Sequence, residues 1–224
     1  RVYNNLKSNK QNTYLTKRAE TKQEMALPDG SLITLNKGSR VTYPKVFSDS
    51  VRTIKLQGEA YFDVMHNAAR PFVIETENAE IKVLGTSFNV ICDDRHARVE
   101  VFVETGKVQV TPANQIYESL ILEPGYIGIV SEQQAAMTVN TDENYLAWKT
   151  GKIVFKAAAL KKVVKTLNKI YDVNIELNND IQNCRFTSTF SNQNLDVILE
   201  VICTTFNLKM DRNENKISLS GTGC

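Results

Sequence analysis

Short apolar runs separated by turn-forming residues constrain this chain more than any other feature of its sequence. Three of them follow one another closely, at Gly58–Val64, Pro71–Ile74 and Val83–Val90. Each run is too short for a helix and is rich in β-branched and aromatic residues, which favours a β-strand. The same rhythm extends from about Leu27 to Asn140, so we predict that this part of the chain is all-β.

Turn signals divide the β-rich part into about twelve short strands, a pattern typical of a β-sandwich, a roll or a solenoid. The run Pro28–Ser31 has the residues of a tight turn, and Gly58 predicts a bend or a bulge. Thr105–Lys107 stands between two strand-like runs, Val99–Val103 and Val108–Val110, which predicts a hairpin. We therefore expect a mainly β fold, either a β-sandwich or a solenoid-like roll.

Helical spacing begins after Trp148. Apolar residues recur every three or four positions from Leu160 to Tyr171 and again from Leu195 to Phe206, with short strand-like runs around them. The order β-α-β followed by β-α-β-β predicts a small α+β domain with two helices. The predicted organisation is a polar linker at 1–24 with one strand near Tyr14–Thr16, an all-β domain at 25–150 and an α+β domain at 151–224.

Composition and charge exclude some functions. The 224-residue chain has a net charge of +2, without the strong clustered basic surplus of nucleic-acid-binding domains, so no nucleic-acid partner is expected. Five lysines of the first predicted helix and its approach are interpreted as a solvated face; they are Lys156, Lys161, Lys162, Lys165 and Lys169. No apolar run is long enough to span a membrane. Because the sequence starts at Arg1 rather than methionine, we interpret it as a fragment, which leaves open a membrane span elsewhere in the full-length protein.

The cysteines and histidines show no metal-ligand spacing. Cys92, Cys184, Cys203 and Cys224 form no CxxC pair, so no metal site is predicted. Four scattered cysteines do not form a disulfide framework, and a bridge between Cys184 and Cys203 is left open for an oxidising compartment. Motifs of the common hydrolases and nucleotide-binding enzymes are absent too, so we expect no cofactor and no catalysis on a diffusible substrate.

The Gly85-Thr86 step is a candidate of another kind. It lies between two predicted strands, where a strained backbone would bring the Thr86 hydroxyl against the Gly85 carbonyl. Attack of the hydroxyl would form an ester that water then cleaves, so that the chain is its own substrate. A simple β-bulge at this step is the structural alternative.

Several runs of the β-rich part resemble the FecR family. They are Leu27–Ser31, Leu35-Asn36, Gly58–Val64, Pro71–Val73 and Val83–Val90, continued in the same order by Gly106–Val108, Leu122–Gly125 and Ala147–Lys149. The helical part, which ends in Ile217–Gly221, is similar to the C-terminal domain of that family. This domain is itself akin to the short N-terminal domain of secretins and TonB-dependent transporters.

The resemblance implies the periplasmic part of a membrane-bound anti-sigma factor. In this family a cytoplasmic N-terminal region holds an extracytoplasmic-function sigma factor, and one transmembrane helix anchors the protein in the inner membrane. Both parts are expected to lie outside the present sequence. The expected partner of the present part is the signalling domain of an outer-membrane TonB-dependent transporter, whose signal reaches the sigma factor. Some relatives cleave themselves at the Gly-Thr step that matches Gly85 and Thr86.

The transporter domain is expected at an open sheet edge. One strand-like run mixes polar and apolar residues and, as an edge strand, would accept a strand of the partner by β-augmentation; its residues are Arg185, Phe186, Thr187, Ser188, Thr189 and Phe190. A central, fully paired strand is the alternative.

A carbohydrate-binding or adhesive β-module is the alternative function. Such a module usually exposes aromatic platforms, whereas Phe62, Phe72 and Phe88 lie in strand patterns that predict burial.

Overall fold

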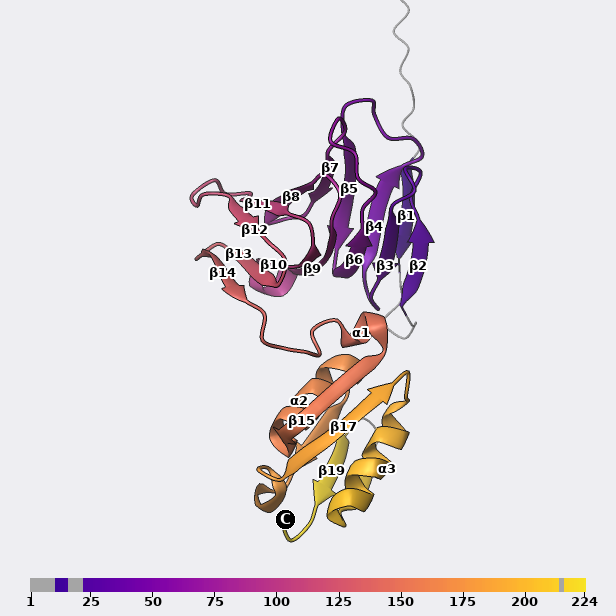
Figure 1. Ribbon diagram of the computed structural model, residues 1–224, viewed down its shortest axis with the longest axis vertical. Helices are drawn as coiled ribbons and strands as arrows, with labels where there is room; N and C mark the ends of the chain where they lie inside the picture. Colours follow the sequence, from indigo (N-terminus) through magenta and orange to yellow (C-terminus); the bar gives the residue numbers. More distant parts are fainter. Residues whose placement is uncertain (1–10, 16–21, 214–215) are drawn as a thin grey trace, which may run out of the picture. The chain divides into compact units, whose positions relative to one another are not determined.

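The computed structural model describes residues 22–213 and 216–224, together with the backbone of 11–15 (Figure 1). The chain divides into two compact units between Thr141 and Asp142, ahead of the boundary at 150/151 that the change of periodicity suggested. The reason lies in the connecting segment: the side chain of Asn144 accepts a hydrogen bond from the Val154 amide (2.7 Å) and donates one to the Val154 carbonyl (2.8 Å). The short helix α1 (Ala147–Thr150) then buries Ala147 in the core of the second unit.

In its described residues, the first unit consists of two seven-stranded sheets. One has the order β1-β4-β5-β7-β8-β11-β12 and the other β2-β3-β6-β9-β10-β13-β14. Both orders rise along the chain, so the backbone passes to and fro between the sheets and adds strands to each in sequence. This is the expected solenoid-like roll, and because the two sheets share one core it is also a β-sandwich.

The strands of the first unit are short. They are β1 (Gln11–Leu15), β2 (Gln23–Ala26), β3 (Leu32–Leu35), β4 (Arg40–Pro44), β5 (Arg52–Gln57), β6 (Glu59–Asp63), β7 (Phe72–Glu75), β8 (Ala79–Val83), β9 (Ser87–Asp93), β10 (Arg98–Thr105), β11 (Val108–Pro112), β12 (Leu120–Leu122), β13 (Tyr126–Ser131) and β14 (Ala135–Val139), with a 3-10 helix η1 (Asp94–His96) between β9 and β10. The predicted linker therefore holds β1, which pairs with β4, and the start of β2. Of the strand expected near Tyr14–Thr16, Thr16 lies outside the described residues.

The core of the first unit follows the predicted alternation. Val99, Val101 and Val103 of β10 are buried between the sheets. Phe62 and Phe88 are fully buried as well, and their ring centroids lie 5.3 Å apart. Phe72 is also buried, so these three aromatic rings stabilise the core, by about 1.5–3 kcal/mol each, and form no exposed platform for a sugar.

Two glycines carry the chain from one sheet to the other. Gly58 (φ +83°) is the single residue between β5 and β6, and a Cβ there would lie 2.9 Å from the Cα of Ser39. Gly106 (φ +78°) stands between β10 and β11, which belong to different sheets. The prediction of a hairpin at Thr105–Lys107 is therefore wrong. A glycine turn reverses the chain, but its local sequence does not specify which sheet the next strand joins.

The second unit follows the predicted order of elements. Strand β15 (Lys152–Ala159) pairs antiparallel with β17 (Arg185–Ser191). In a second sheet, β19 (Lys216–Ser220) lies between β16 (Asn174–Leu177) and β18 (Lys209–Asn213). Helices α2 (Leu160–Tyr171) and α3 (Leu195–Phe206) bury the expected apolar stripes, and α2 contacts β15 and β17 of one sheet and β16 of the other. A 3-10 helix η2 (Asn179–Ile181) follows β16.

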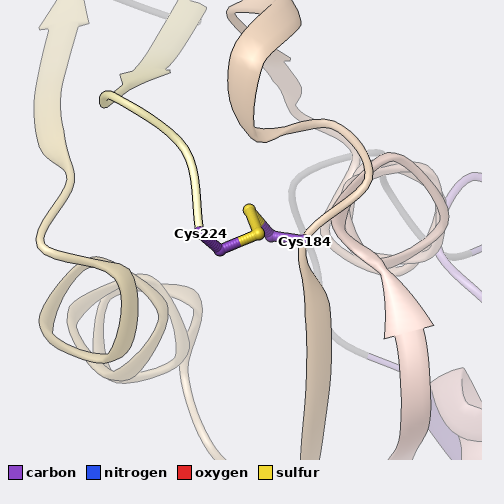
Figure 2. Close-up of a disulfide and its surroundings, with 2 residues drawn as sticks. All are labelled: Cys184 and Cys224. Carbon is purple, nitrogen blue, oxygen red and sulfur yellow. A yellow bond between two sulfur atoms is a disulfide. The ribbon is translucent and has the colours of Figure 1, made fainter.

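A disulfide joins Cys184, directly before β17, to Cys224, the last residue of the sequence (Figure 2). The bridge between Cys184 and Cys203 that the sequence left open is not formed, and Cys203 of α3 is a free thiol. The tail that follows β19 runs beside the segment leading to Cys184, where the Asn178 side chain donates a hydrogen bond to the Gly221 carbonyl at 3.1 Å. This neighbourhood arises from the pairing of β16 with β19, which the spacing of the cysteines does not reveal.

Candidate functional site

The Gly85-Thr86 step between β8 and β9 is tightly enclosed. A Cβ on Gly85 would lie 2.5 Å from the Cα of His66. A Cβ on Gly106 would lie 2.8 Å from Thr86 Oγ1 and 2.9 Å from the Gly85 carbonyl oxygen. Because real side chains do not tolerate such contacts with a backbone, both positions need glycine for packing, whatever chemistry the step performs.

Thr86 is buried, and its hydroxyl donates a hydrogen bond to the carbonyl of Lys107 at 3.1 Å. Neither Gly85 nor Thr86 has a positive φ, and the described residues contain no cis peptide bond. The irregularity in the ladder lies in the opposite strand, β10, rather than at the step itself. The cleavage hypothesis invokes a strained backbone, but neither a positive φ nor a cis peptide bond is present at this step. Self-cleavage at Gly85-Thr86 stays a prediction.

A buried ion pair holds the loop that carries His66. Arg52 at the start of β5 is 1% exposed, and its Nη1 lies 2.7 Å from Asp29 Oδ2. The same guanidinium donates hydrogen bonds to the carbonyls of Met65 (2.8 Å) and Arg70 (2.8 Å), at the two ends of this loop. Asp29 belongs to the Pro28–Ser31 turn, so the turn and the loop are fixed to each other through one arginine.

The turn adds a second connection of its own. The Ser31 hydroxyl donates to Asp29 Oδ2 at 2.8 Å and accepts a hydrogen bond from the Met65 amide at 3.0 Å. Sequence reasoning treated this segment as a turn only and missed the ion pair. The available signal was an arginine at the start of a strand whose alternate residues, Ile54 and Leu56, are apolar, since that pattern places the arginine on the buried face.

Carboxylates on the outer face of the first unit's other sheet, which contains β6, β9 and β10, also have structural partners. The two oxygens of Glu59 accept hydrogen bonds from the side-chain amides of Asn36 (2.7 Å) and Asn89 (3.0 Å). The Tyr61 hydroxyl donates to Glu104, and burial together with this carboxylate raises the pKa of Tyr61. In the part of the chain that the structure describes, no group of three or more His, Cys, Asp or Glu side chains could hold a metal ion. That the protein uses no metal or cofactor stays a prediction.

The segment predicted to bind a partner forms most of β17. Within the described residues, β17 pairs with β15 alone, so its other edge carries no strand. Phe186 and Phe190 are buried and stack at 6.3 Å between ring centroids, so their side chains belong to the core and do not reach a partner. Arg185 and Thr187 both form hydrogen bonds with the backbone of Ala157 in β15. What β17 offers to a partner is therefore its backbone edge, with the side chain of Thr189 exposed beside it.

The open edge of β18 was not anticipated from the sequence. Strand β18 pairs with β19 alone among the described strands, and all five of its residues are exposed. The predicted order β-α-β-β ends in two strands, and β18 and β19 pair antiparallel. Exposure of both faces could have been read from the run Lys209–Asn213, since it contains one apolar residue, Met210.

The fold and its edges define a class of protein: a two-sheet β-roll joined to a small domain of two 12-residue helices, one short helix and two sheets. None of the helices among the described residues is long and apolar enough to cross a membrane. Residues 12–109 match the family described as FecR protein, and residues 152–219 match the family described as FecR, C-terminal. The chain belongs to the FecR family.

Two solved structures are similar to almost the whole chain. Both are crystal structures of a candidate anti-sigma factor from Parabacteroides distasonis ATCC 8503, determined at 1.65 Å and 2.50 Å resolution. Each is 27% identical in sequence with a TM-score of 0.67. The similarity covers 93% of this chain and 98% of the first structure, and 95% of this chain and 100% of the second. No curated protein matches the chain.

Proposed function

We propose that this chain is the sensor part of a membrane-bound anti-sigma factor. It receives a signal from the signalling domain of an outer-membrane TonB-dependent transporter and relays it to an extracytoplasmic-function sigma factor. The observation that carries this proposal is the match of both units, in order, to the two FecR families, together with similar structures of a candidate anti-sigma factor. In this proposal the chain is not an enzyme. Two further parts of the protein lie outside the present sequence: a cytoplasmic region that binds the sigma factor and a transmembrane helix that anchors the protein in the membrane.

A periplasmic location is part of the proposal. The Cys184–Cys224 disulfide supports it, because such bonds form and persist in oxidising compartments such as the periplasm and are rare in the cytosol. Fractionation of cells that express the full-length protein would test the location, and recovery of the present part in the cytosol would contradict it.

The open edge of β17 is the proposed contact for the transporter domain. An edge strand presents unpaired backbone N–H and C=O groups, and a strand from another chain can satisfy them. The disulfide at Cys184 anchors the start of this strand, and Phe186 and Phe190 anchor its inner face. The edge is thus held in an extended form before the partner arrives, which lowers the entropy cost of binding.

A pair of proline substitutions tests this contact. In an antiparallel strand, successive residues direct their N–H groups to opposite edges, so of Ser188→Pro and Thr189→Pro one disturbs the β15 ladder and the other affects only the open edge. We expect the variant that keeps the wild-type circular dichroism and melting temperature to lose binding to the signalling domain of a TonB-dependent transporter from the same organism, measured by calorimetry.

An equivalent pair of proline substitutions in β18, Asp211→Pro and Arg212→Pro, serves as the comparison. If the folded β17 variant binds as tightly as wild type while Asp211→Pro or Arg212→Pro abolishes binding, the contact lies at β18 instead. If no edge variant changes binding, the mode of contact is wrong, but the partnership stands. Absence of any binding by the wild-type protein would contradict the partnership itself.

A further inference from the structure

Helix α2 exposes a face that consists only of lysines. Lys161, Lys162, Lys165 and Lys169 are all exposed. At about 100° of rotation per residue they occupy an arc of about 100°, and no other residue of α2 falls within it. The buried stripe of the helix, centred on Leu160, Val163, Val164 and Leu167, lies on the opposite side. We call these four residues the lysine face.

The position of the lysine face is unfavourable for the helix itself. Lys161 and Lys162 stand in the first turn, which contains no acidic residue, although the positive end of the helix dipole is located there. The residue before the helix, Ala159, provides no side-chain cap. The first two helical amides donate instead to the carbonyls of Cys184 (2.9 Å) and Gln182 (3.0 Å).

Like charges also repeat along the lysine face. Lys161 and Lys165 are four residues apart, as are Lys165 and Lys169, and such pairs of equal charge destabilise a helix. The second helix of the same unit has the usual arrangement: Asn194 caps α3 by accepting a hydrogen bond from the Val197 amide, and Asp196 lies in the first turn. The contrast is therefore between two helices that share one core.

No carboxylate neutralises the first three lysines within the described residues. Among the described residues of the second unit, the ion pairs involve other cations: Lys156 with Glu143, Arg212 with Asp196, and Lys216 with Glu176. Lys169 lies over the ring of Tyr145, with its Nζ 5.1 Å from the ring centroid. Lys161, Lys162 and Lys165 point their charge to the solvent alone.

We propose that the lysine face binds the surface of an anionic phospholipid bilayer. A bilayer surface attracts charge through a diffuse field and needs no matching geometry, and each lysine near it adds about five-fold to the binding constant. Protein interfaces are instead depleted in lysine and enriched in arginine and aromatic anchors, none of which lies within this arc. Lys161, Lys162 and Lys165 lie in a row of about 6 Å along the helix axis, so their ammonium groups can reach one plane, while Lys169 contacts Tyr145. This inference does not depend on the proposed partner of β17.

Vesicle binding tests the proposal. Co-sedimentation would use vesicles of phosphatidylcholine mixed with anionic phosphatidylglycerol, whose negative surface potential attracts basic segments, and vesicles of phosphatidylcholine alone. We expect binding to the anionic vesicles only, weakened as salt rises because the attraction is screened. The triple variant Lys161→Gln, Lys162→Gln, Lys165→Gln should bind about 100-fold more weakly.

A matched control removes the same charge elsewhere. Lys45→Gln, Lys82→Gln, Lys209→Gln changes three exposed lysines outside α2 and should keep most of the binding. The α2 variant should melt at the same temperature as wild type or higher, since it loses repulsive pairs, which separates lost binding from lost folding.

Three results would overturn the proposal. They are absence of binding to anionic vesicles at low salt, equal weakening by the two triple variants, and a stable α2 variant that loses an acidic protein partner while it still binds the vesicles. The last result would assign the lysine face to a protein interface.

Discussion

Loss of the Cys184–Cys224 disulfide should unfold the second unit at a much lower temperature and leave the first unit unchanged. The bond joins residues 40 positions apart and encloses β17, α3, β18 and β19. In the loop-entropy description, opening a loop of this length gives the unfolded chain roughly 13 cal/mol/K of entropy, or about 4 kcal/mol at 25 °C. For a domain of roughly 60–100 residues, each kcal/mol lowers Tm by roughly 4–8 °C. We therefore expect a fall of at least about 15 °C.

The variant Cys224→Ser is the suitable perturbation, since Cys224 is exposed whereas Cys184 is 1% exposed and its replacement would also disturb the core. Fluorescence of Trp148, the single tryptophan of the chain, follows the second unit because it lies in α1. Wild-type protein in reductant should melt like the variant, and reductant should not affect the variant further. An unchanged Trp148 melting curve of wild type with and without reductant would refute the reasoning.

Three more predictions concern the first unit. Asp29→Asn leaves the buried Arg52 without its counter-charge and should lower the free energy of unfolding, measured by urea denaturation, by about 3–5 kcal/mol. A loss below about 1 kcal/mol would show that water or the backbone carbonyls are enough to stabilise the buried guanidinium. Mass spectrometry should find that a fraction of the wild-type protein is cleaved between Gly85 and Thr86 and that the Thr86→Ala variant is intact. If the wild-type protein is intact as well, the role of Thr86 is limited to its structural hydrogen bond. Burial, aided by the nearby Asp94 charge, raises the pKa of the Cys92 thiol to about 12. Native protein at pH 8 should therefore resist iodoacetamide at Cys92 while denatured protein reacts there, and rapid native labelling would contradict this burial.

Local patterns predicted the elements of this fold better than their partners. The alternation of Val99, Val101 and Val103 identified a strand with one buried face, and the spacing from Leu160 to Tyr171 identified α2, because each depends on neighbours in the sequence. Pairing depends on distant segments. The turn at Thr105–Lys107 was therefore assigned to one sheet although it crosses between two.

The same limit applies to the candidate sites. The segment 185–190 was predicted to be a strand, with an open edge and full pairing as the two alternatives. Burial of Phe186, however, follows from its packing against Phe155 of β15 and Phe206 of α3, and Phe190 stacks on Phe186. The contact between Asp29 and Arg52 joins residues that no local pattern connects. Sequence reasoning could mark the glycines at 85 and 106 as turn residues, but their close approach to each other arises only when the two sheets pack together.

The rising strand order of the two sheets has a consequence for how the first unit is made. Each new strand joins an edge formed by strands already synthesised: β9 adds to β6, β10 to β9, and β13 to β10, while β7, β8 and β11 extend the other sheet in the same way. A chain that emerges N-terminus first, from a ribosome or a membrane pore, can therefore assemble from its leading end without waiting for its last segment. In each sheet the next strand to join covers the growing edge, while the outer edges of the first strands, β1 and β2, stay unpaired among the described strands. The strands left at the end of this process are β12 and β14, one in each sheet, whose outer edges no later strand of the described chain covers.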